Sequence, residues 1–506
     1  MNLKKRIVVA ATALAMAVTS SISAGLPASA ANQSTLTLGS MIQVKSWEPS
    51  QADLGHMAPL YQAAYDNLIT RDAKGNYQPN LAVAWIFNNS KTKLTLNLRR
   101  GVTFSDGTKF DATAAKANLD AFISGNGPYS VTLAGDTVQI VDPYTITITT
   151  QVANPDLLYY LATTDSYMAS PKAIGTPGLK TVPSGSGPYL YDNSSVIGSQ
   201  YVFTANPKYW DKTKIKFDRI VFKFMPDVTA RLNALLSGQI DATLLDVKTS
   251  STAKGRGFTQ YTNYTDWAGL LMLDRNGKVD PNLADVRVRQ AIAYSVDRAA
   301  LLKAVQGGQG KVTQQPFGKV SGAFDAALDN AYSVNNAKAK SLLAAAGHPN
   351  GLTINLPSWP DPTLCAVLSD QLSKSGITIN WVSVPFADYR NQLKAGKWAA
   401  GVFQLGLVQQ TPWVTINFLA APNGSWNVFH STDPVIANAL KAIGNDPSDR
   451  TILAKAKTIN AFLVNQAWYI PFYNLPQLYF TNKHVKTDNS VANAVPYLYN
   501  YAPTGN

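Results

Sequence analysis

The stretch "RGVTFSDGTKFDATAAKANLDAF" at residues 100–122 combines a strand, a tight turn and the start of a helix. Val102 to Phe104 form a short apolar run, and Ser105 to Thr108 form a polar turn. The Asp-Gly pair in this turn favours the positive φ angles of a hairpin, and Asp111 is placed to cap the helix that follows. The pattern predicts a chain-reversing scaffold rather than a catalytic loop.

Around this hairpin, strand-like and helix-like segments alternate along the chain, which is typical of a mixed α/β fold. Strands rich in Thr, Val, Ile and Leu are expected at residues 34–41, 93–99, 137–141 and 145–152. Helices are expected at residues 56–69, 227–238, 283–308 and 336–348, the third ending at Gly307-Gly308. The character of these segments changes near residues 265–275, which suggests that the chain forms two α/β lobes.

Residues 1–30 have the pattern of a secretory signal peptide, with a basic start, an apolar run at 7–18 and the small-residue site Ala28-Ser29-Ala30. The apolar run is too short to cross a bilayer, which takes about 20 residues. The lone cysteine, Cys365, lies too deep in the chain for lipid anchoring and excludes an internal disulfide. We therefore expect an exported, soluble, periplasmic protein that starts near Ala31.

The chain carries 44 Lys and Arg against 31 Asp and Glu, a formal charge of +13. These basic residues are dispersed rather than clustered, so the pattern predicts a solvated surface and no nucleic-acid partner. Serine-hydrolase, zinc-protease and phosphate-loop motifs are absent from the sequence. We therefore expect that the protein is not an enzyme and has no catalytic residue, no cofactor and no metal site. Paired carboxylates leave a secreted hydrolase open as an alternative.

Several segments in order resemble the extracytoplasmic solute-binding proteins of family 5, the peptide and nickel class that serves ABC importers. The segment at 79–122 resembles that family's Leu-Ala-x-x-Trp segment followed by a Leu-Arg-x-Gly-Val-x-Phe-x-Asp-Gly hairpin. The others are "GSGPYLY" (185–191), "NPKYWD" (206–211), "ARLNALLSGQIDA" (230–242), "DVRVRQAIAYSVDRAALL" (285–302), "NAKAKSLLAAAGHPNG" (336–351) and "AWYIPFYN" (467–474).

This resemblance implies an α/β, two-lobed periplasmic-binding-protein fold of class II, which closes about a hinge and carries an extra subdomain on lobe one. The implied lobe one comprises residues 31–75, 186–270 and 470–506. The accessory subdomain comprises residues 76–185, and lobe two comprises residues 271–469. The implied function is capture of an oligopeptide-like solute between the lobes by a monomeric receptor, which then meets the permease subunits of an ABC importer in the membrane.

The segment "FQLGLVQQTPWVTINFL" at 403–419 departs from the family pattern. Peptide-binding members carry Gly-Trp-x-x-Asp here, and that Asp pairs with the peptide's amino group. Leu407 and Gln410 stand at the matching places, and no Asp or Glu occurs between Tyr389 and Asp433. A buried ammonium needs a charge partner, so an acid from elsewhere in the chain would have to replace it.

The resemblance gives a set of expected ligand-binding residues, some at the start of the helix near 56 and the hinge near 267, the others in or after 403–419. They are His56, Met57, Trp267, Gln409, Gln410, Trp413, Trp426 and His430. The tryptophans are equally explained as core residues. Aromatic and amide side chains also suit a sugar or another neutral polar solute, and the two histidines suit a nickel complex. Both ligands remain alternatives to the peptide.

Overall fold

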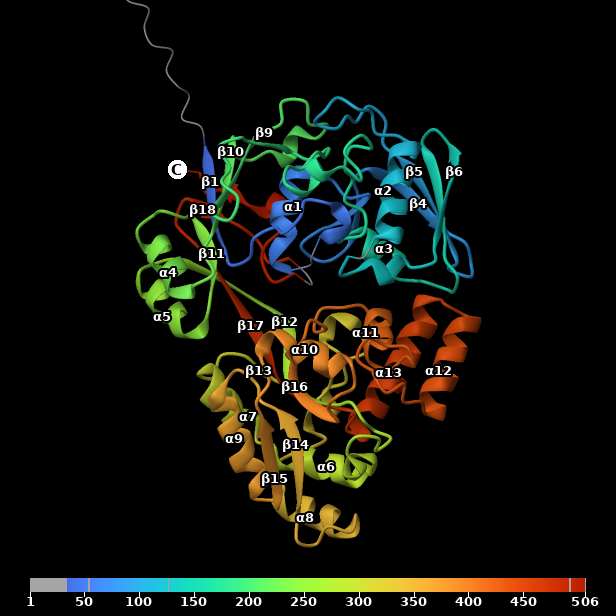
Figure 1. Ribbon diagram of the computed structural model, residues 1–506, viewed down its shortest axis with the longest axis vertical. Helices are drawn as coiled ribbons and strands as arrows, with labels where there is room; N and C mark the ends of the chain where they lie inside the picture. The colour runs from blue at the N-terminus through green and yellow to red at the C-terminus, as the bar shows by residue number, and fades with distance from the viewer. Residues whose placement is uncertain (1–33, 53–54, 126, 491–492, 506) are drawn as a thin grey trace, which may run out of the picture.

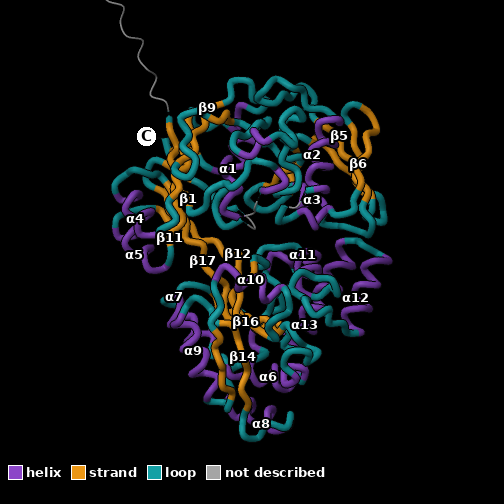
Figure 2. The backbone as a smooth tube through the Cα atoms, in the orientation of Figure 1, coloured by secondary structure: helices purple, strands orange, loops and turns teal. Residues whose placement is uncertain are grey.

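Two lobes joined by a pair of long strands make up the molecule (Figure 1). The computed structural model describes residues 34–52, 55–125, 127–490 and 493–505, so the expected signal peptide lies outside the described residues. Within these ranges no helix is long and apolar enough to cross a membrane. We call the body that holds α1 to α5 the upper lobe and the body that holds α6 to α13 the lower lobe (Figures 1 and 2).

A nine-stranded mixed sheet runs through both lobes in the order β16-β12-β17-β11-β1-β10-β9-β8, with β13 paired to β17. Its strands are β1 (Thr35–Ser40), β8 (Tyr189–Tyr191), β9 (Gln200–Ala205), β10 (Arg219–Phe224), β11 (Ala242–Leu245), β12 (Thr259–Met272), β13 (Lys311–Val312), β16 (Ala400–Leu405) and β17 (Tyr469–Thr481).

The connection between the lobes is the antiparallel pair β12 and β17, which is in register from Thr259↔Thr481 to Leu271↔Tyr469. The register shifts between Tyr264 and Asp266 and again between Ala268 and Gly269. Such bulges bend a strand and re-aim its side chains. The carboxylate of Asp266 thus stands at an irregular point of the strand that links the lobes.

The upper lobe contains the extra subdomain that the resemblance implied, on the right of Figure 1. Its sheet has the order β4-β5-β7-β6, from β4 (Ala82–Phe87), β5 (Lys93–Leu98), β6 (Thr137–Asp142) and β7 (Thr145–Thr149). Gly107 in the turn has φ +83°, and the Asp111 side chain accepts a hydrogen bond from Ala114 N at 3.0 Å. Both expectations about this turn and cap are confirmed.

The remaining upper-lobe elements pack against the main sheet or beside the subdomain. The helices are α1 (Ala58–Ala64), α2 (Ala112–Ser124), α3 (Leu157–Leu161), α4 (Val228–Leu236) and α5 (Val247–Gly255), and the short strands are β2 (Ile69–Arg71), β3 (Tyr77–Pro79), β18 (Val485–Lys486) and β19 (Ala502–Pro503). The single helix expected at 56–69 was wrong in extent: α1 ends at Ala64, and Ile69 already belongs to a strand.

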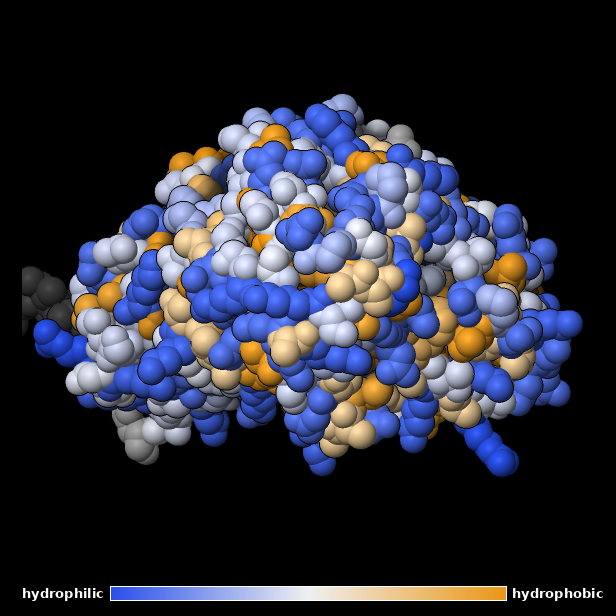
Figure 3. All heavy atoms as spheres, turned by 90° about the horizontal axis from the view of Figure 1, so that it is seen from below, coloured by the Kyte–Doolittle hydropathy of each residue, from blue (hydrophilic) through white to orange (hydrophobic). Residues whose placement is uncertain are grey.

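The lower lobe packs helices around a parallel pair, β14 (Leu352–Pro357) and β15 (Ile377–Val382), and the end of the main sheet. Its helices are α6 (Val286–Ser295), α7 (Arg298–Gln306), α8 (Asn336–Ala345), α9 (Pro362–Ser373), α10 (Phe386–Lys394), α11 (Pro412–Leu419), α12 (Pro434–Asn445) and α13 (Asp449–Asn465). Seen from below, this lobe presents mainly hydrophilic side chains with scattered hydrophobic ones (Figure 3).

The one long helix expected at 283–308 is instead two helices, α6 and α7. The chain is extended at Val296, and the Asp297 side chain accepts from Ala300 N and so begins a new helix. Apolar spacing did not reveal this break, because Val296 and Leu301 are buried in the same core on either side of it. The predicted stop was correct, since Gly307 ends α7 with φ +56°.

Candidate functional site

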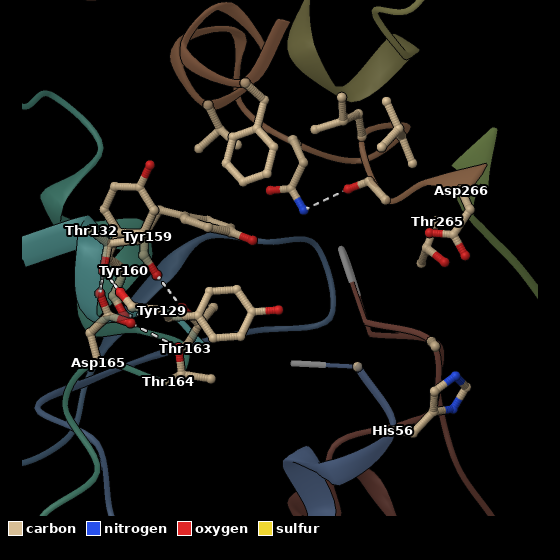
Figure 4. A pocket seen from close by; sticks show the side chains of 18 residues that line it. His56, Tyr129, Thr132, Tyr159, Tyr160, Thr163, Thr164, Asp165, Thr265 and Asp266 are labelled. Atoms are coloured by element: carbon tan, nitrogen blue, oxygen red, sulfur yellow. Dashed lines mark hydrogen bonds between the residues drawn. The ribbon is translucent and has the colours of Figure 1, made fainter. Parts of the chain in front are cut away.

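A cavity of about 290 Å³ lies between the two lobes, beside the connecting strands (Figure 4). Residues from the upper lobe, the strand β12 and the lower lobe all contribute to its walls. They are Gly55, His56, Tyr129, Thr132, Tyr159, Tyr160, Thr163, Thr164, Asp165, Thr265, Asp266, Leu405, Gly406, Leu407, Gln410, Val414, Phe418 and Ala494.

The upper-lobe wall comes from α3 and the residues after it, together with the segment near Tyr129 (Figure 4). Asp165 is only 2% exposed, and burial raises the pKa of its carboxyl group to about 7. Thr164 Oγ1 donates to Asp165 Oδ1 at 2.8 Å, and the Thr132 hydroxyl donates to Oδ2. Both oxygens of this carboxyl group are therefore already hydrogen-bonded within the protein.

The opposite wall comes from β12 and from the loop that follows β16. Asp266 accepts a hydrogen bond from Gln477 Nε2 at 2.9 Å through Oδ2. In the described part of the chain no Lys or Arg forms an ion pair with it, and burial raises the pKa of its carboxyl group. Figure 4 places Asp266 across the cavity from Asp165.

Gln410 enters the cavity from the same loop. Its Nε2 donates to the carbonyl oxygen of Gly406 at 3.1 Å, which fixes the orientation of the amide. The residue is only 7% exposed, and its Oε1 is buried without a hydrogen-bond partner. A buried acceptor left without a donor costs about 1–3 kcal/mol, and a bound ligand that donates a hydrogen bond would remove that cost.

A hydrogen bond also joins the lobes directly at the edge of this site. The Thr411 hydroxyl, at the N-terminus of α11 in the lower lobe, donates to Asp156 Oδ2, just before α3 in the upper lobe. The Asp156 side chain is buried, and that burial raises its pKa to about 6. The two walls of the cavity are thus held in contact by side chains as well as by the connecting strands.

Two of the eight sequence-predicted residues, His56 and Gln410, line this cavity. Trp267 and Gln409 line a second cavity of about 280 Å³ beside the connecting strands, with Lys311 and Lys319 among its other residues. Met57 is 8% exposed and packs in the upper-lobe core. The structure thus divides these five candidate residues between two cavities and the upper-lobe core.

The other three predicted residues do not line the inter-lobe cavity. Trp426 is 3% exposed, with its ring 4.6 Å from that of Phe403 in the lower-lobe core. Trp413 is half-buried and packs against the same core. His430 is exposed, with φ +54° and Nδ1 2.8 Å from the Pro422 carbonyl oxygen. His56 and His430 are therefore not brought to one site, and the described residues hold no group of three metal-ligating side chains.

Sequence reasoning missed the three tyrosines and both carboxylates of the cavity. A usable signal existed for Asp266, which is an acidic residue inside the otherwise aromatic and apolar strand "YTDWAGLLM". The tyrosine pair at 159–160 and Asp165 gave no such signal, because hydroxyl and aromatic residues near a short helix are ordinary in any fold.

Comparison with known proteins gives a consistent result. The model of the family described as "Bacterial extracellular solute-binding proteins, family 5 Middle" matches residues 76–427. The chain is 28% identical over 463 residues to heme-binding protein A of Haemophilus influenzae, with 81% of each chain covered. It is 26% identical over 431 residues to a glutathione-binding protein of Escherichia coli, which covers 78% of this chain and 80% of that one.

Solved structures of the same overall fold include a dipeptide-binding protein from Pseudoalteromonas in complex with Met-Leu, with a TM-score of 0.78 and 17% identity. That match covers 93% of this chain and 100% of the other. A Campylobacter jejuni protein in complex with nickel and L-histidine has a TM-score of 0.75 and 22% identity, with 92% and 99% covered. The two-lobed architecture expected from the sequence is thereby confirmed.

Proposed function

Since the chain belongs to the bacterial extracellular solute-binding proteins of family 5, we propose that its inter-lobe cavity binds a short peptide-like solute for an ABC importer. Its relatives include binding proteins for a D,D-dipeptide and for glutathione. Capture outside the cytoplasmic membrane and delivery to permease subunits are the functions of such a receptor. The proposed receptor is a monomer, and its function includes no catalytic step.

The observation that carries the proposal is the cavity whose walls come from both lobes. A ligand that contacts both walls stabilises the closed arrangement, because binding favours the conformation in which more contacts form. The paired strands β12 and β17 supply the hinge, and their register shifts lie beside the cavity. A volume of about 290 Å³ suits a solute of two or three residues better than a long peptide.

A neutral polar solute such as a sugar is the second candidate, and a specific observation favours it. Tyr129, Tyr159 and Tyr160 line one wall, and each combines an aromatic ring with a hydroxyl group. Flat aromatic rings stack on the apolar faces of sugars, and hydroxyl groups exchange hydrogen bonds with their edges. A nickel complex held by His56 and His430 lacks such support, because only His56 lines the cavity.

Two measurements on purified protein test these assignments. Mass spectrometry after denaturation identifies any solute that stays bound through purification, which slow dissociation permits. Thermal unfolding with defined dipeptides and with disaccharides then ranks the two classes, because a ligand that binds only the folded state raises the midpoint. Stabilisation by disaccharides alone would refute the peptide assignment. A substrate consumed without the transporter would refute the absence of catalysis.

A further inference from the structure

Besides tyrosine and threonine hydroxyl groups, the polar side chains that line the inter-lobe cavity are mainly hydrogen-bond acceptors. Two carboxyl groups, Asp165 and Asp266, line it from opposite sides, and the unpartnered Oε1 of Gln410 adds a neutral acceptor. No lysine or arginine is among the described residues that line it. His56 is the one basic side chain there, and an imidazole lacks the permanent positive charge of an ammonium or a guanidinium group.

The two carboxyl groups differ in how far the protein already satisfies them. Both oxygens of Asp165 accept hydrogen bonds from threonine hydroxyls. Asp266 accepts a hydrogen bond from Gln477 on Oδ2, and no lysine or arginine of the described chain forms an ion pair with it. A largely buried carboxylate without a counter-ion is costly, so Asp266 gains the most from a ligand that brings a positive charge.

Gly406 brings Asp266 and Gln410 close to the same point. Its carbonyl oxygen holds the Gln410 amide at 3.1 Å, and a Cβ atom at this glycine would lie 3.0 Å from Asp266 Oδ1. The absence of a side chain at Gly406 therefore leaves the Oδ1 atom approachable from the cavity. Because the Gln410 amide turns its Nε2 toward Gly406, its Oε1 is left to accept a hydrogen bond from another donor of the ligand.

Aromatic rings on the other wall favour the same kind of ligand. The faces of Tyr129, Tyr159 and Tyr160 are electron-rich, and a cation near such a face gains about 0.5–2 kcal/mol. A ligand carboxylate, by contrast, would meet two carboxyl groups and no lysine or arginine partner. The cavity is therefore suited to a net positive solute and unsuited to one that must bury a free carboxylate.

We propose that this cavity selects a solute with a primary amine and no buried carboxylate, that Asp266 holds the ammonium group, and that Gln410 Oε1 accepts a hydrogen bond from another part of the ligand. This inference rests on the proposed function, because it assigns the chemistry of the ligand to the same inter-lobe site. It moves the amine partner from the loop at 406–410 to the strand that connects the lobes.

The test uses isothermal titration of the purified mature protein with matched probes. Leucyl-leucinamide carries one positive charge, its N-acetyl form is neutral, and leucyl-leucine is a zwitterion. Tyramine and 4-ethylphenol form a second pair that differs in the amine but contains no peptide bond. We expect the amide to bind about 10- to 100-fold more tightly than its N-acetyl form, as a charged hydrogen bond implies, and more tightly than leucyl-leucine.

The matched variants are Asp266→Asn and Asp370→Asn. Asp266→Asn should weaken leucyl-leucinamide by about 10- to 100-fold and leave the N-acetyl form within about twofold. Asp370 is an exposed residue of α9, paired with Lys374 at 2.7 Å, so Asp370→Asn controls for the loss of one negative charge. It should bind every probe as the unmodified protein does.

The outcomes separate this inference from the proposed function. Equal affinity for the amide and its N-acetyl form overturns the inference while the peptide assignment stands, and this comparison needs no variant. Binding of tyramine but of no peptide supports the inference and overturns the peptide assignment. An amine preference that survives in Asp266→Asn overturns the role of Asp266, and failure of every amine probe to bind overturns the inference as a whole.

Discussion

Replacing Gly269 by alanine should destabilise the strand pair that connects the lobes. Gly269 is a buried residue of β12 at a register shift, and a Cβ atom there would lie 2.5 Å from the Ile470 carbonyl oxygen and 2.7 Å from Pro471 Cα. Carbon–oxygen contacts are normally about 3.3–3.6 Å, so the methyl group is about 0.8 Å too close. Both contacts are backbone atoms of β17, which move only if the strands separate.

Overpacking of this kind costs about 1–3 kcal/mol, and we expect Gly269→Ala near the upper end because no flexible side chain can yield. The assay is urea unfolding followed by tryptophan fluorescence, with far-ultraviolet circular dichroism as the second probe. Gly444→Ala is the matched control, since Gly444 is exposed on α12 with nothing within 4 Å of the added Cβ. That change should stabilise the protein by about 0.5–1 kcal/mol. Equal unfolding midpoints for the two variants would refute the reasoning.

Three further predictions concern the cavity and its edge. Gly406→Ala should weaken the binding of an amine ligand about tenfold or more while folding is retained, because the added methyl group lies against Asp266 Oδ1. Titration with leucyl-leucinamide checks this, and an unchanged affinity contradicts it. The pKa of Asp165 is raised to about 7, so the folded state holds a proton that the unfolded state releases near pH 4. The free energy of unfolding should therefore fall as the pH rises from 4 to 7. In Asp165→Asn, urea unfolding should show that this fall is smaller, by at most about 4 kcal/mol over the whole range. Thr411→Val should loosen the contact with Asp156 and increase the radius of gyration in X-ray scattering, whereas Thr411→Ser, which keeps the hydroxyl, should not.

Local rules predicted the parts of the fold in which one residue decides one conformation. The Asp-Gly turn at 106–107, the cap at Asp111 and the helix end at Gly307 were all predicted correctly, because each depends on backbone geometry within a few residues. The break between α6 and α7 was missed, because a stripe of buried residues continues across it. The alternation of segments and the change near residues 265–275 suggested two α/β lobes, and the resemblance of motifs added the hinge-closing periplasmic-binding-protein fold.

The candidate site was predicted less well, because its walls are assembled from segments far apart in the sequence. Gln410 and His56, which line the cavity, were both found through the places that the family resemblance gives them. The tyrosines and Asp165 come from the region after residue 125, where no motif suggested a ligand. Trp426, an attractive stacking residue in the sequence, is instead packed in the core, since aromatic residues fill cores more often than pockets.

The chain leaves the upper lobe along β12 and returns to it along β17, so the lower lobe is inserted between two paired strands while Ser34 and Gly505 both belong to the upper lobe (Figure 1). A stretching force applied to the two chain ends therefore acts first on the upper lobe. In a single-molecule pulling experiment, the lower lobe should stay folded until the β12–β17 ladder parts. It should then extend as one late step of roughly 195 residues, about 3.3–3.6 Å of contour for each. Bound ligand should raise the force of the step that separates the lobes, so mechanical extension would report occupancy of the cavity without any label near it.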